Sequence, residues 1–419
     1  SNLCTCDRHY QKMTPTNGIL KYDKILERAL RESYDDKSIK ILKIDTHFGN
    51  TKGLNFLSDF LKTTLRYKKS GKNGDIVEGS VNLVIKSEPS TGKSALEIFR
   101  QQDLFATEWK MYRDILPRIE KITSLKIGPK ILYGSEDSKT LVMEDITMDG
   151  FQMMEPYKRL SMEHCLLVIT KLAILHGGSV ALYEKNPELV KSMKGGILSP
   201  KCPYAFLRLI EVTLLNISRE IRNWSGDGYL ECSEKLKKMA ERIKDQVIKD
   251  FDYDSDEFCV INHGDCWINN IMFKNNERGE PSDALLVDYQ MSVYTSPAID
   301  LHYFLNICPE TTLKHDNDDF LINNYLTVLT NAMKSTGCVT KPPTIGDLKQ
   351  AMYKRRTYAV FAGLVLFPRM IADNEDVEDF DEVLGRLNGD TRMNIFKRED
   401  AVTAMRKTII AMNELGYLD

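Results

Sequence analysis

Cysteine is sparse in this sequence and follows no pattern. The nine cysteines include no Cys-x-x-Cys pair, and no histidine stands at the spacing of a zinc finger. An odd number of scattered cysteines argues against a disulfide framework and against a structural zinc site. We therefore expect reduced thiols and a cytoplasmic location.

The chain also lacks an excess of charge of either sign. Its 57 Lys and Arg residues face 60 Asp and Glu residues, which gives a formal net charge of −3. A protein with no surplus of positive charge is poorly suited to neutralise a nucleic-acid backbone. We expect no nucleic-acid partner, and any recognition of phosphate should take place in a local pocket.

Long hydrophobic runs are missing as well. The longest apolar run lies near residues 358–368 and is followed by Arg369. It is roughly half of the ~20 residues that a membrane helix needs. The first residues show no basic region followed by an apolar stretch, as a secretory signal would. We expect no membrane-spanning segment.

The first ~145 residues combine short strands with one helical region. Apolar strand patterns occupy residues 39–44, 81–85, 131–133 and 140–143, with clusters of Gly, Asn and Lys between them. Apolar residues recur at helical spacing over residues 95–122, where Pro117 interrupts the pattern near its end. This part of the chain predicts an α+β lobe.

The rest of the chain is mostly helical in pattern. Two short apolar strands, residues 259–261 and 284–287, interrupt it. The acidic run at residues 373–382 is typical of a solvated loop. Helical spacing is found at residues 162–182, 203–222, 232–249, 320–333, 344–370 and 399–415.

One motif carries most of the chemical information. The string His263-Gly264-Asp265-Cys266-Trp267-Ile268-Asn269-Asn270 directly follows a short strand, and the next strand ends at Asp288. Phosphoryl transfer from a metal-bound nucleotide needs a carboxylate that accepts the proton of the attacking hydroxyl. It also needs oxygen ligands for Mg²⁺, which an amide and a second carboxylate supply. The alternative is a loop whose polar residues only cap the chain.

Together with two further strings, this motif identifies a family resemblance. The strings are Val287-Asp288-Tyr289-Gln290, followed closely by Ser296-Pro297-Ala298-Ile299-Asp300-Leu301, and Leu141-Val142-Met143-Glu144-Asp145. The chain resembles the insect ecdysteroid kinase-like family, which is related to choline kinases, aminoglycoside phosphotransferases and protein kinases. The resemblance extends from about Ile39 to the last helix.

The resemblance implies a fold and a set of cosubstrates. It implies an α+β, two-lobed, protein-kinase-like fold with a small β-rich lobe at residues 1–143 and a large helical lobe at residues 144–419. The hinge would lie at about residues 141–147. ATP and Mg²⁺ would bind in the cleft.

The resemblance also implies residue roles. Asp265 would be the catalytic base, and Asn270 and Asp288 would be the Mg²⁺ ligands. The hinge residues Met143, Glu144 and Asp145 would bind adenine through main-chain groups. An alcohol has a pKa far above 7, so Asp265 would mainly orient the acceptor hydroxyl.

Lys86 and Glu108 are the expected partners that reach the nucleotide phosphates. Lys86 ends the strand at residues 81–85, and Glu108 stands in the following helical region. A lysine held by a helix glutamate is the arrangement found in kinases. Taken alone, the two residues could equally be surface charges. An unpartnered lysine at the end of an apolar strand would be costly.

The loop that would cover the phosphates is the least defined element. The resemblance places it at residues 53–58, where the nucleotide-binding residues would be Asn55, Phe56 and Ser58. Main-chain N–H groups and the Ser58 hydroxyl could contact phosphates there. The loop has one glycine where kinases have three, and a plain turn remains open.

A second phosphate-binding motif competes with this interpretation. Residues 87–94 end in Gly92-Lys93-Ser94 between a strand and a helix, which is where a Walker A loop would lie. The first position is Ser87, where that motif has glycine. A P-loop also belongs to a parallel βαβ sheet, which the later sequence does not suggest. We favour a turn followed by a helix.

Asp300 and His263 are expected to support the catalytic loop, residues 263–270, whereas His176 and Trp267 are ambiguous. Asp300 would brace the loop through its backbone or through His263, and it also suits the first turn of a helix. His176 lies on an apolar helix face and is expected to be a core histidine with its hydrogen bonds satisfied. Trp267 could line the acceptor side of the site or serve packing alone.

The expected substrate is a small-molecule alcohol. Within residues 182–259, four aromatic residues (Tyr204, Phe206, Trp224 and Tyr229) could hold an apolar molecule. The resemblance implies an ecdysteroid or another hydroxylated lipophilic compound, such as a xenobiotic. No Ala-Pro-Glu motif follows Asp288, which disfavours protein substrates. A catalytically silent binding protein of the same fold is the remaining alternative.

Overall fold

The fold is described from a computed structural model. It describes residues 15–48, 58–71, 73–90, 93–155, 158–370, 396 and 398–419. Contacts between Cα atoms divide the chain into two compact units. The first contains Ser1–Thr51, Asp59–Ser87 and Lys130–Asp145, and the second contains Lys52–Ser58, Glu88–Pro129 and Ile146–Asp419.

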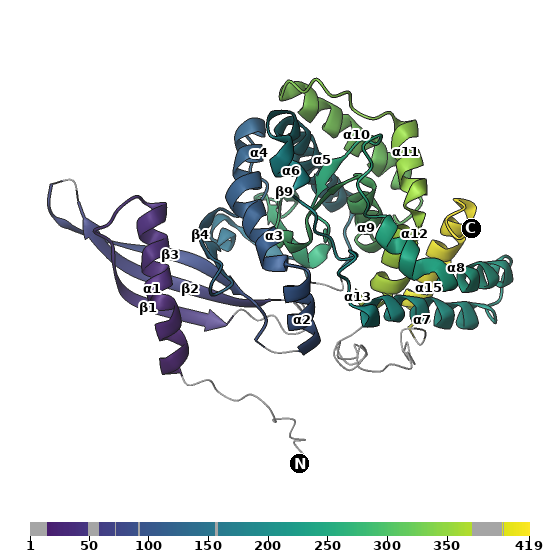
Figure 1. The fold of residues 1–419 in the computed structure, drawn as a ribbon, viewed down its shortest axis with the longest axis horizontal. Helices are drawn as coiled ribbons and strands as arrows, with labels where there is room; N and C mark the ends of the chain where they lie inside the picture. The colour runs from purple at the N-terminus through teal and green to yellow at the C-terminus, as the bar shows by residue number, and fades with distance from the viewer. Residues whose placement is uncertain are drawn as a thin grey trace, which may run out of the picture. The chain divides into compact units, whose positions relative to one another are not determined.

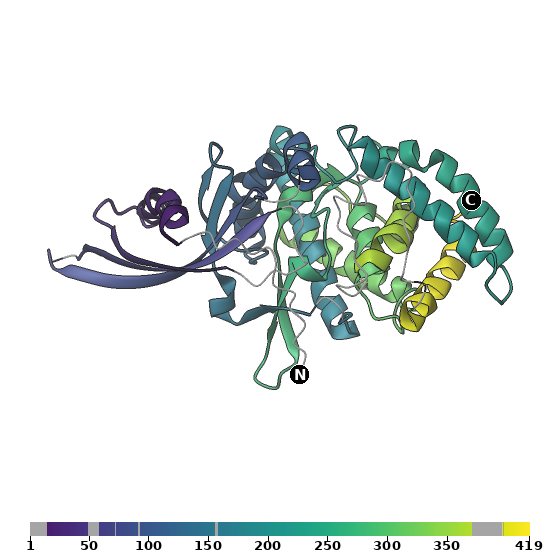
Figure 2. The same cartoon turned by 90° about the horizontal axis from the view of Figure 1, so that it is seen from below.

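The first unit is an antiparallel sheet with one helix. The strand order is β1-β2-β3-β5-β4. The helix α1 lies along one face of the sheet (Figure 1 and Figure 2). The elements are α1 (Pro15–Ser33), β1 (Lys40–Phe48), β2 (Asp59–Ser70), β3 (Ile76–Ser87), β4 (Ile131–Ser135) and β5 (Thr140–Glu144).

Apolar residues of α1 and of the central strands form the core of this unit. Leu26 and Leu30 on α1 pack with Leu65 on β2 and with Leu83 and Ile85 on β3. In β2 the buried residues alternate with more exposed ones, as the two-residue period of a strand requires. Sequence analysis predicted neither α1 nor β2, because neither has an apolar run that stands out from its surroundings.

The second unit is mostly helical. It contains a two-stranded pair, β7 with β10, and a three-stranded antiparallel sheet in the order β6-β8-β9. Its strands are β6 (Phe151–Met153), β7 (Val260–Asn262), β8 (Ile271–Asn275), β9 (Pro281–Leu286) and β10 (Val293–Thr295).

Its helices follow the predicted helical regions closely. Before the catalytic loop they are α2 (Lys93–Gln101), α3 (Leu104–Lys110), the π-helix η1 (Met111–Ile115), α4 (Leu116–Thr123), the 3-10 turn η2 (Ile146–Asp149), α5 (Met162–Lys185), α6 (Pro187–Lys191), α7 (Tyr204–Ile221) and α8 (Tyr229–Lys249). Within and after the loop they are η3 (Ile268–Asn270), η4 (Tyr289–Met291), α9 (Ala298–Ile307), α10 (Asp318–Ser335), α11 (Ile345–Lys354), α12 (Arg356–Val360), the π-helix η5 (Phe361–Leu366), α13 (Phe367–Met370) and α15 (Glu399–Glu414).

The helix α5 is the central helix of this unit. By length and composition it could cross a membrane, which differs from the expectation that no segment could, but 78% of its apolar window is buried inside the protein. Its glycines allow close packing: a Cβ added at Gly178 would lie 2.4 Å from Ile119 of α4. A Cβ at Gly177 would lie 3.0 Å from Ala332 of α10. These contacts are those of a core helix.

The helix α9 is buried along its whole length. A buried lysine and a partly buried arginine hold its C-terminal end. The Lys314 ammonium donates to the carbonyl of Asn306 at 2.5 Å, and the Arg159 guanidinium donates to that of Ile307 at 3.2 Å. Both cations lie over the ring of Phe367. Burial lowers the pKa of Lys314, and it lowers the pKa of Arg159 to about 10. Positive charge at this end interacts favourably with the negative end of the helix dipole.

The α+β, two-lobed fold class is confirmed by the antiparallel sheet of the first unit and the helical second unit. The two units are not continuous in sequence, since residues 88–129 group with the C-terminal part. The lobe boundary expected at about residues 141–147 stays a prediction.

A buried histidine on α9 predicts a pH dependence of stability. Burial lowers the pKa of His302 from 6.5 to about 4, and its Nε2 donates to the carbonyl of Met352 at 2.8 Å. The unfolded state therefore binds a proton between pH 6.5 and 4 that the folded state excludes. The free energy of unfolding should fall as the pH falls through this window, by at most about 1.4 kcal/mol per pH unit.

The matched variant is His302→Gln, which keeps a donor but cannot titrate. Chemical denaturation at several pH values should show a flatter profile for this variant than for the native chain. Asp250 contributes in the opposite direction, because burial raises its pKa to about 6. Its contribution is common to both proteins, so their difference isolates His302. Identical slopes would contradict the assignment.

Candidate active site

The predicted catalytic loop follows β7, and its second residue is a glycine at a position where a side chain would collide with the backbone. Gly264 has φ +84°, a conformation that side chains disfavour. A Cβ added there would lie 2.1 Å from the carbonyl oxygen of Met291. The backbone of the loop therefore packs directly on the segment that follows Asp288.

One buried carboxylate holds this loop. Asp300 is fully buried, and its two oxygens accept hydrogen bonds from the backbone N–H of His263 at 2.6 Å and of Gly264 at 2.8 Å. The N–H of Asp300 itself donates to the side-chain oxygen of Asn262 at 3.2 Å. Both the side chain and the backbone N–H of Asp300 thus form hydrogen bonds that connect α9 to the loop and to β7.

His176 of α5 completes the surroundings of Asp300. Its Nε2 donates to an Asp300 oxygen at 3.0 Å, and its Nδ1 lies 2.8 Å from the hydroxyl of Tyr325 on α10. The prediction of a core histidine with satisfied hydrogen bonds is confirmed. Its link to Asp300 was not predicted, because the two residues are far apart in sequence.

The Asp265 carboxylate has a donor on each oxygen. The amide nitrogen of Asn270 lies 2.9 Å from Oδ2 and 2.9 Å from the backbone oxygen of the same residue. The hydroxyl of Tyr303 on α9 donates to Oδ1. Sequence analysis missed Tyr303, and the signal that could have found it is its place one helical turn after Asp300.

Asn270 and Asp288 lie at the same end of the β8–β9 pair. Ile271 pairs with Leu286, and the N–H of Val287 donates to the carbonyl of Asn270 at 3.0 Å. Asp288 has φ 68° and ψ 66°, a strained conformation for a residue other than glycine. Strain of this kind is concentrated at functional sites.

These residues fit a Mg²⁺ ion by the chemistry of their donors. The nitrogen of the Asn270 amide is committed to Asp265, and its Oδ1 accepts no hydrogen bond from the described part of the chain. Asp288 adds a carboxylate, and Mg²⁺ prefers such oxygen ligands completed by waters and phosphates. The described residues contain no group of three His, Cys, Asp or Glu side chains that could hold a metal without such help.

His263 connects the loop to the strand that leads to Asp288. Its Nδ1 accepts from the N–H of Asp265 at 3.3 Å. Its Nε2 therefore carries the proton and donates to the carbonyl of Val287 at 3.0 Å. The imidazole spans the gap between the predicted base and the predicted metal ligand.

In the first unit, Lys86 and the hinge residues lie on adjacent strands. Lys86 is buried on β3, pairs with Leu141 of β5, and places its ammonium 5.4 Å from the ring centre of Phe60. Met143 and Glu144 pair with Val84 and Leu83 of the same strand β3.

The N–H groups at the expected hinge already have acceptors. The N–H of Glu144 donates to the carbonyl of Lys130 at 3.0 Å, and that of Asp145 donates to Asn82 at 3.3 Å. Adenine recognition through the main chain at these two residues would therefore rely on carbonyl groups.

The structure describes two of the four remaining predicted residues, Glu108 and Ser58. Glu108 is buried on α3 in the second unit, so its predicted pairing with Lys86 stays a prediction. Ser58 is buried directly before β2, and its hydroxyl makes no hydrogen bond with the described residues. Asn55 and Phe56 lie outside the described residues.

The competing P-loop interpretation does not fit the sheet. The strand β3 that precedes residues 87–94 belongs to an antiparallel sheet. A P-loop connects a strand of a parallel sheet to its helix. Residues 91 and 92 of the motif lie outside the described residues, and Lys93 begins α2.

All but one of the aromatic residues expected near the acceptor make internal contacts. Phe206 meets Phe361 edge to face at 6.2 Å. Trp224 and Tyr229 both contact the guanidinium of Arg406. Trp267 is buried within the catalytic loop. These contacts favour packing roles for these four residues. Tyr204, by contrast, is 67% exposed.

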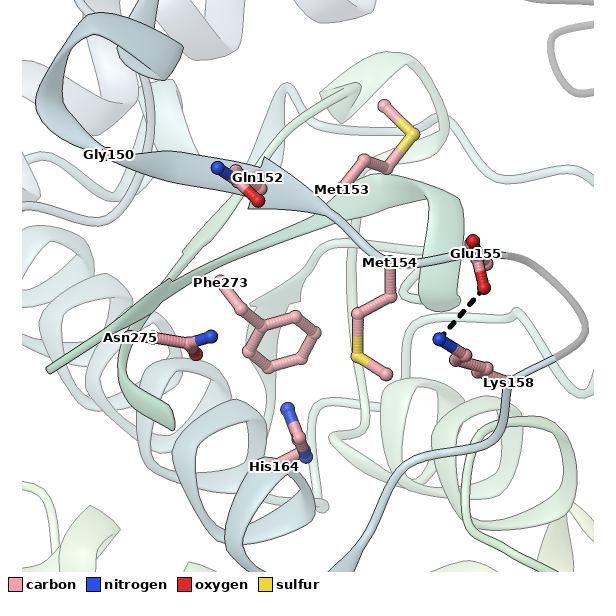
Figure 3. A pocket seen from close by; sticks show the side chains of 9 residues that line it. All are labelled: Gly150, Gln152, Met153, Met154, Glu155, Lys158, His164, Phe273 and Asn275. Atoms are coloured by element: carbon pink, nitrogen blue, oxygen red, sulfur yellow. Dashed lines mark ion pairs between the residues drawn. The ribbon is translucent and has the colours of Figure 1, made fainter. Parts of the chain in front are cut away.

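A cavity of about 440 Å³ lies elsewhere in the second unit, between the β6–β8 strands and the start of α5 (Figure 3). The rings of Phe273 and His164 meet edge to face at 4.8 Å. Lys158 and Glu155 form an ion pair of 2.9 Å at its side. None of the predicted site residues lines this cavity.

The antiparallel-sheet unit and the helical unit with its braced loop are consistent with a kinase-like fold. Residues 52–338 match the ecdysteroid kinase-like family. The match covers more than half of the chain, and the protein belongs to this family, whose members act on small molecules. A comparison with curated proteins gave no match.

The bracing role of Asp300 predicts the effect of a conservative substitution. Asp300 accepts hydrogen bonds from three donors: the His176 imidazole and the N–H groups of His263 and Gly264. In Asp300→Asn, the amide nitrogen replaces one carboxylate oxygen and must face at least one of these donors. A buried donor without an acceptor costs about 1–3 kcal/mol. We expect the free energy of unfolding from urea denaturation to fall by about 3 kcal/mol.

The control is Asp319→Asn on α10, since that side chain is 71% exposed. Its urea midpoint should match that of the native chain. An Asp300→Asn variant as stable as this control would show that Asp300 does not hold the loop.

Proposed function

We propose that the protein transfers the γ-phosphoryl group of ATP to the hydroxyl of a small-molecule alcohol. The observation that carries the proposal is the Asp265 carboxylate, whose two oxygens accept hydrogen bonds from the Asn270 amide and the Tyr303 hydroxyl. The strained Asp288 follows Val287, whose N–H donates to the carbonyl of Asn270. The family membership supports the kinase chemistry. The acceptor we propose is an ecdysteroid or another hydroxylated lipophilic compound, including xenobiotics.

The chain's own residues would contribute orientation and charge. Asp265 would accept a hydrogen bond from the acceptor hydroxyl and then its proton. As the acceptor oxygen bonds to the γ-phosphorus, the bond to the bridging oxygen breaks and ADP leaves with that electron pair. Asp265 would return the proton to solvent. The acceptor thus becomes a phosphate monoester.

Asn270 and Asp288 would hold Mg²⁺, and Lys86 would contact the phosphates. When bound, Mg²⁺ would neutralise charge on the phosphate oxygens. Lys86 would be positioned by Glu108, and residues 143–145 would receive adenine. Ser58 with Asn55 and Phe56 would cover the phosphates. Activity in the cytoplasm and the absence of nucleic-acid and membrane partners belong to the same proposal.

The base assignment predicts a separation of binding from transfer. Asp265→Asn should keep ATP affinity within about threefold, because the side chain has no expected contact with the nucleotide. The rate of ADP formation with an acceptor should fall by about 10²–10⁴-fold, the usual contribution of a general base. Isothermal calorimetry and coupled ADP detection measure the two effects. A variant with unchanged turnover would contradict the assignment.

Two lysines distinguish the kinase site from a P-loop. Lys86→Ala should weaken ATP binding by about tenfold or more, since it removes a charge-assisted contact with phosphates. Lys93→Ala is the matched control and should bind ATP like the native chain. The reverse pattern would favour a P-loop. Tight ATP binding without ADP formation for any acceptor would favour a catalytically silent binding protein.

A further inference from the structure

Tyr303 is a buried tyrosine whose hydroxyl forms a hydrogen bond with the Asp265 carboxylate of the catalytic loop. It stands on α9, three residues after Asp300, and is 1% exposed. Its hydroxyl contacts Oδ1 of Asp265. An ionised carboxylate has no proton to give, so the phenol must be the donor.

The position of this hydroxyl is fixed by the packing around it. The Tyr303 ring stacks on Tyr358 with centres 6.3 Å apart and an angle of 17° between the planes. The helix beneath it is joined to the catalytic loop by Asp300 and capped at its far end by Arg159 and Lys314. The helix therefore sets where the hydroxyl lies.

The donors on Asp265 restrict how its carboxylate can turn. The terminal torsion of an aspartate is broad when nothing holds it. Here the amide of Asn270 donates to Oδ2 at 2.9 Å and Tyr303 donates to Oδ1. Two donors on opposite oxygens define the plane of the carboxylate. A carboxylate oxygen has two lone pairs, so an oxygen that accepts one hydrogen bond can in general accept a second.

We propose that Tyr303 is a positioning residue for phosphoryl transfer. Its hydroxyl holds the Asp265 carboxylate in the orientation that accepts the proton of the acceptor alcohol. The inference rests on the proposed function, in which Asp265 is the base. Burial raises the pKa of Tyr303 well above 10, so the phenol keeps its proton and stays a donor at neutral pH.

A purely structural role for Tyr303 would have different consequences. If its hydroxyl only satisfied a buried acceptor, its loss would lower stability and leave the turnover of the folded enzyme unchanged. If it orients Asp265, its loss would lower kcat in the folded enzyme. A misplaced catalytic group can reduce the rate by about 10²-fold without affecting substrate affinity.

The test is Tyr303→Phe in the full chain, with ATP, Mg²⁺ and an acceptor that the native protein phosphorylates. The ring and its stacking remain, and only the hydroxyl is lost. We expect kcat to fall by about 10- to 100-fold. The KM values for ATP and for the acceptor should stay within about twofold. ATP affinity, measured by calorimetry, reports that the variant is folded.

Tyr358→Phe provides a matched control. Tyr358 is equally buried and stacks on Tyr303, but its hydroxyl has no hydrogen-bond partner among the described residues. Removing that hydroxyl should leave kcat unchanged. A kcat loss of equal size in both variants would overturn the proposal, because it would trace the effect to packing.

A double variant tests whether Tyr303 acts through Asp265. Single-turnover rates with excess enzyme should be equal for Asp265→Asn and for Asp265→Asn with Tyr303→Phe. A further loss of tenfold in the double variant would overturn the proposal, as would native kcat in Tyr303→Phe alone. A native protein that phosphorylates no acceptor would instead refute the proposed function, and the inference with it.

Discussion

The site depends on one buried negative charge. Asp300 is fully buried, and it is stable there because three donors face it: two backbone N–H groups of the catalytic loop and one imidazole nitrogen. A buried charge without such partners would be very costly. The requirement to satisfy Asp300 therefore fixes the loop, and the loop in turn places Asp265, Asn270 and the segment before Asp288.

The helix α9 connects the bracing by Asp300 to the orientation of the Asp265 carboxylate. Its first turn carries Asp300 and its next turn carries Tyr303, so one rigid element contacts both the backbone of the loop and the side chain of Asp265. Lys314 and Arg159 satisfy its last carbonyls. Preorganisation of this kind is what phosphoryl transfer requires, because the protein contributes orientation and charge more than covalent chemistry.

The sequence predicted the fold class and the position of the motif well, for physical reasons. The strands at residues 81–85 and 140–143 and the helix at residues 162–182 are apolar enough to be recognised alone. By contrast, α1 is amphipathic and follows no motif, and it forms because the sheet offers it an apolar face. Its existence depends on tertiary packing that local patterns do not contain.

The same distinction applies to the site. Asp265, Asn270 and Asp288 are recognisable because their spacing is local. Tyr303 contacts Asp265, 38 residues away in sequence, and His176 contacts Asp300, 124 residues away. Both contacts depend on how helices pack, which no short stretch of the sequence encodes. The roles of Lys86, Glu108 and the hinge remain predictions, since they depend on how the lobes meet.

The most direct measurement is ³¹P NMR of the native protein with ATP, Mg²⁺ and a pool of hydroxylated steroids. The account predicts a new phosphate-monoester signal, coupled to a proton on the acceptor carbon, that grows as the γ-phosphate signal of ATP declines. An ATP spectrum that stays unchanged, or one that yields only inorganic phosphate, would contradict it.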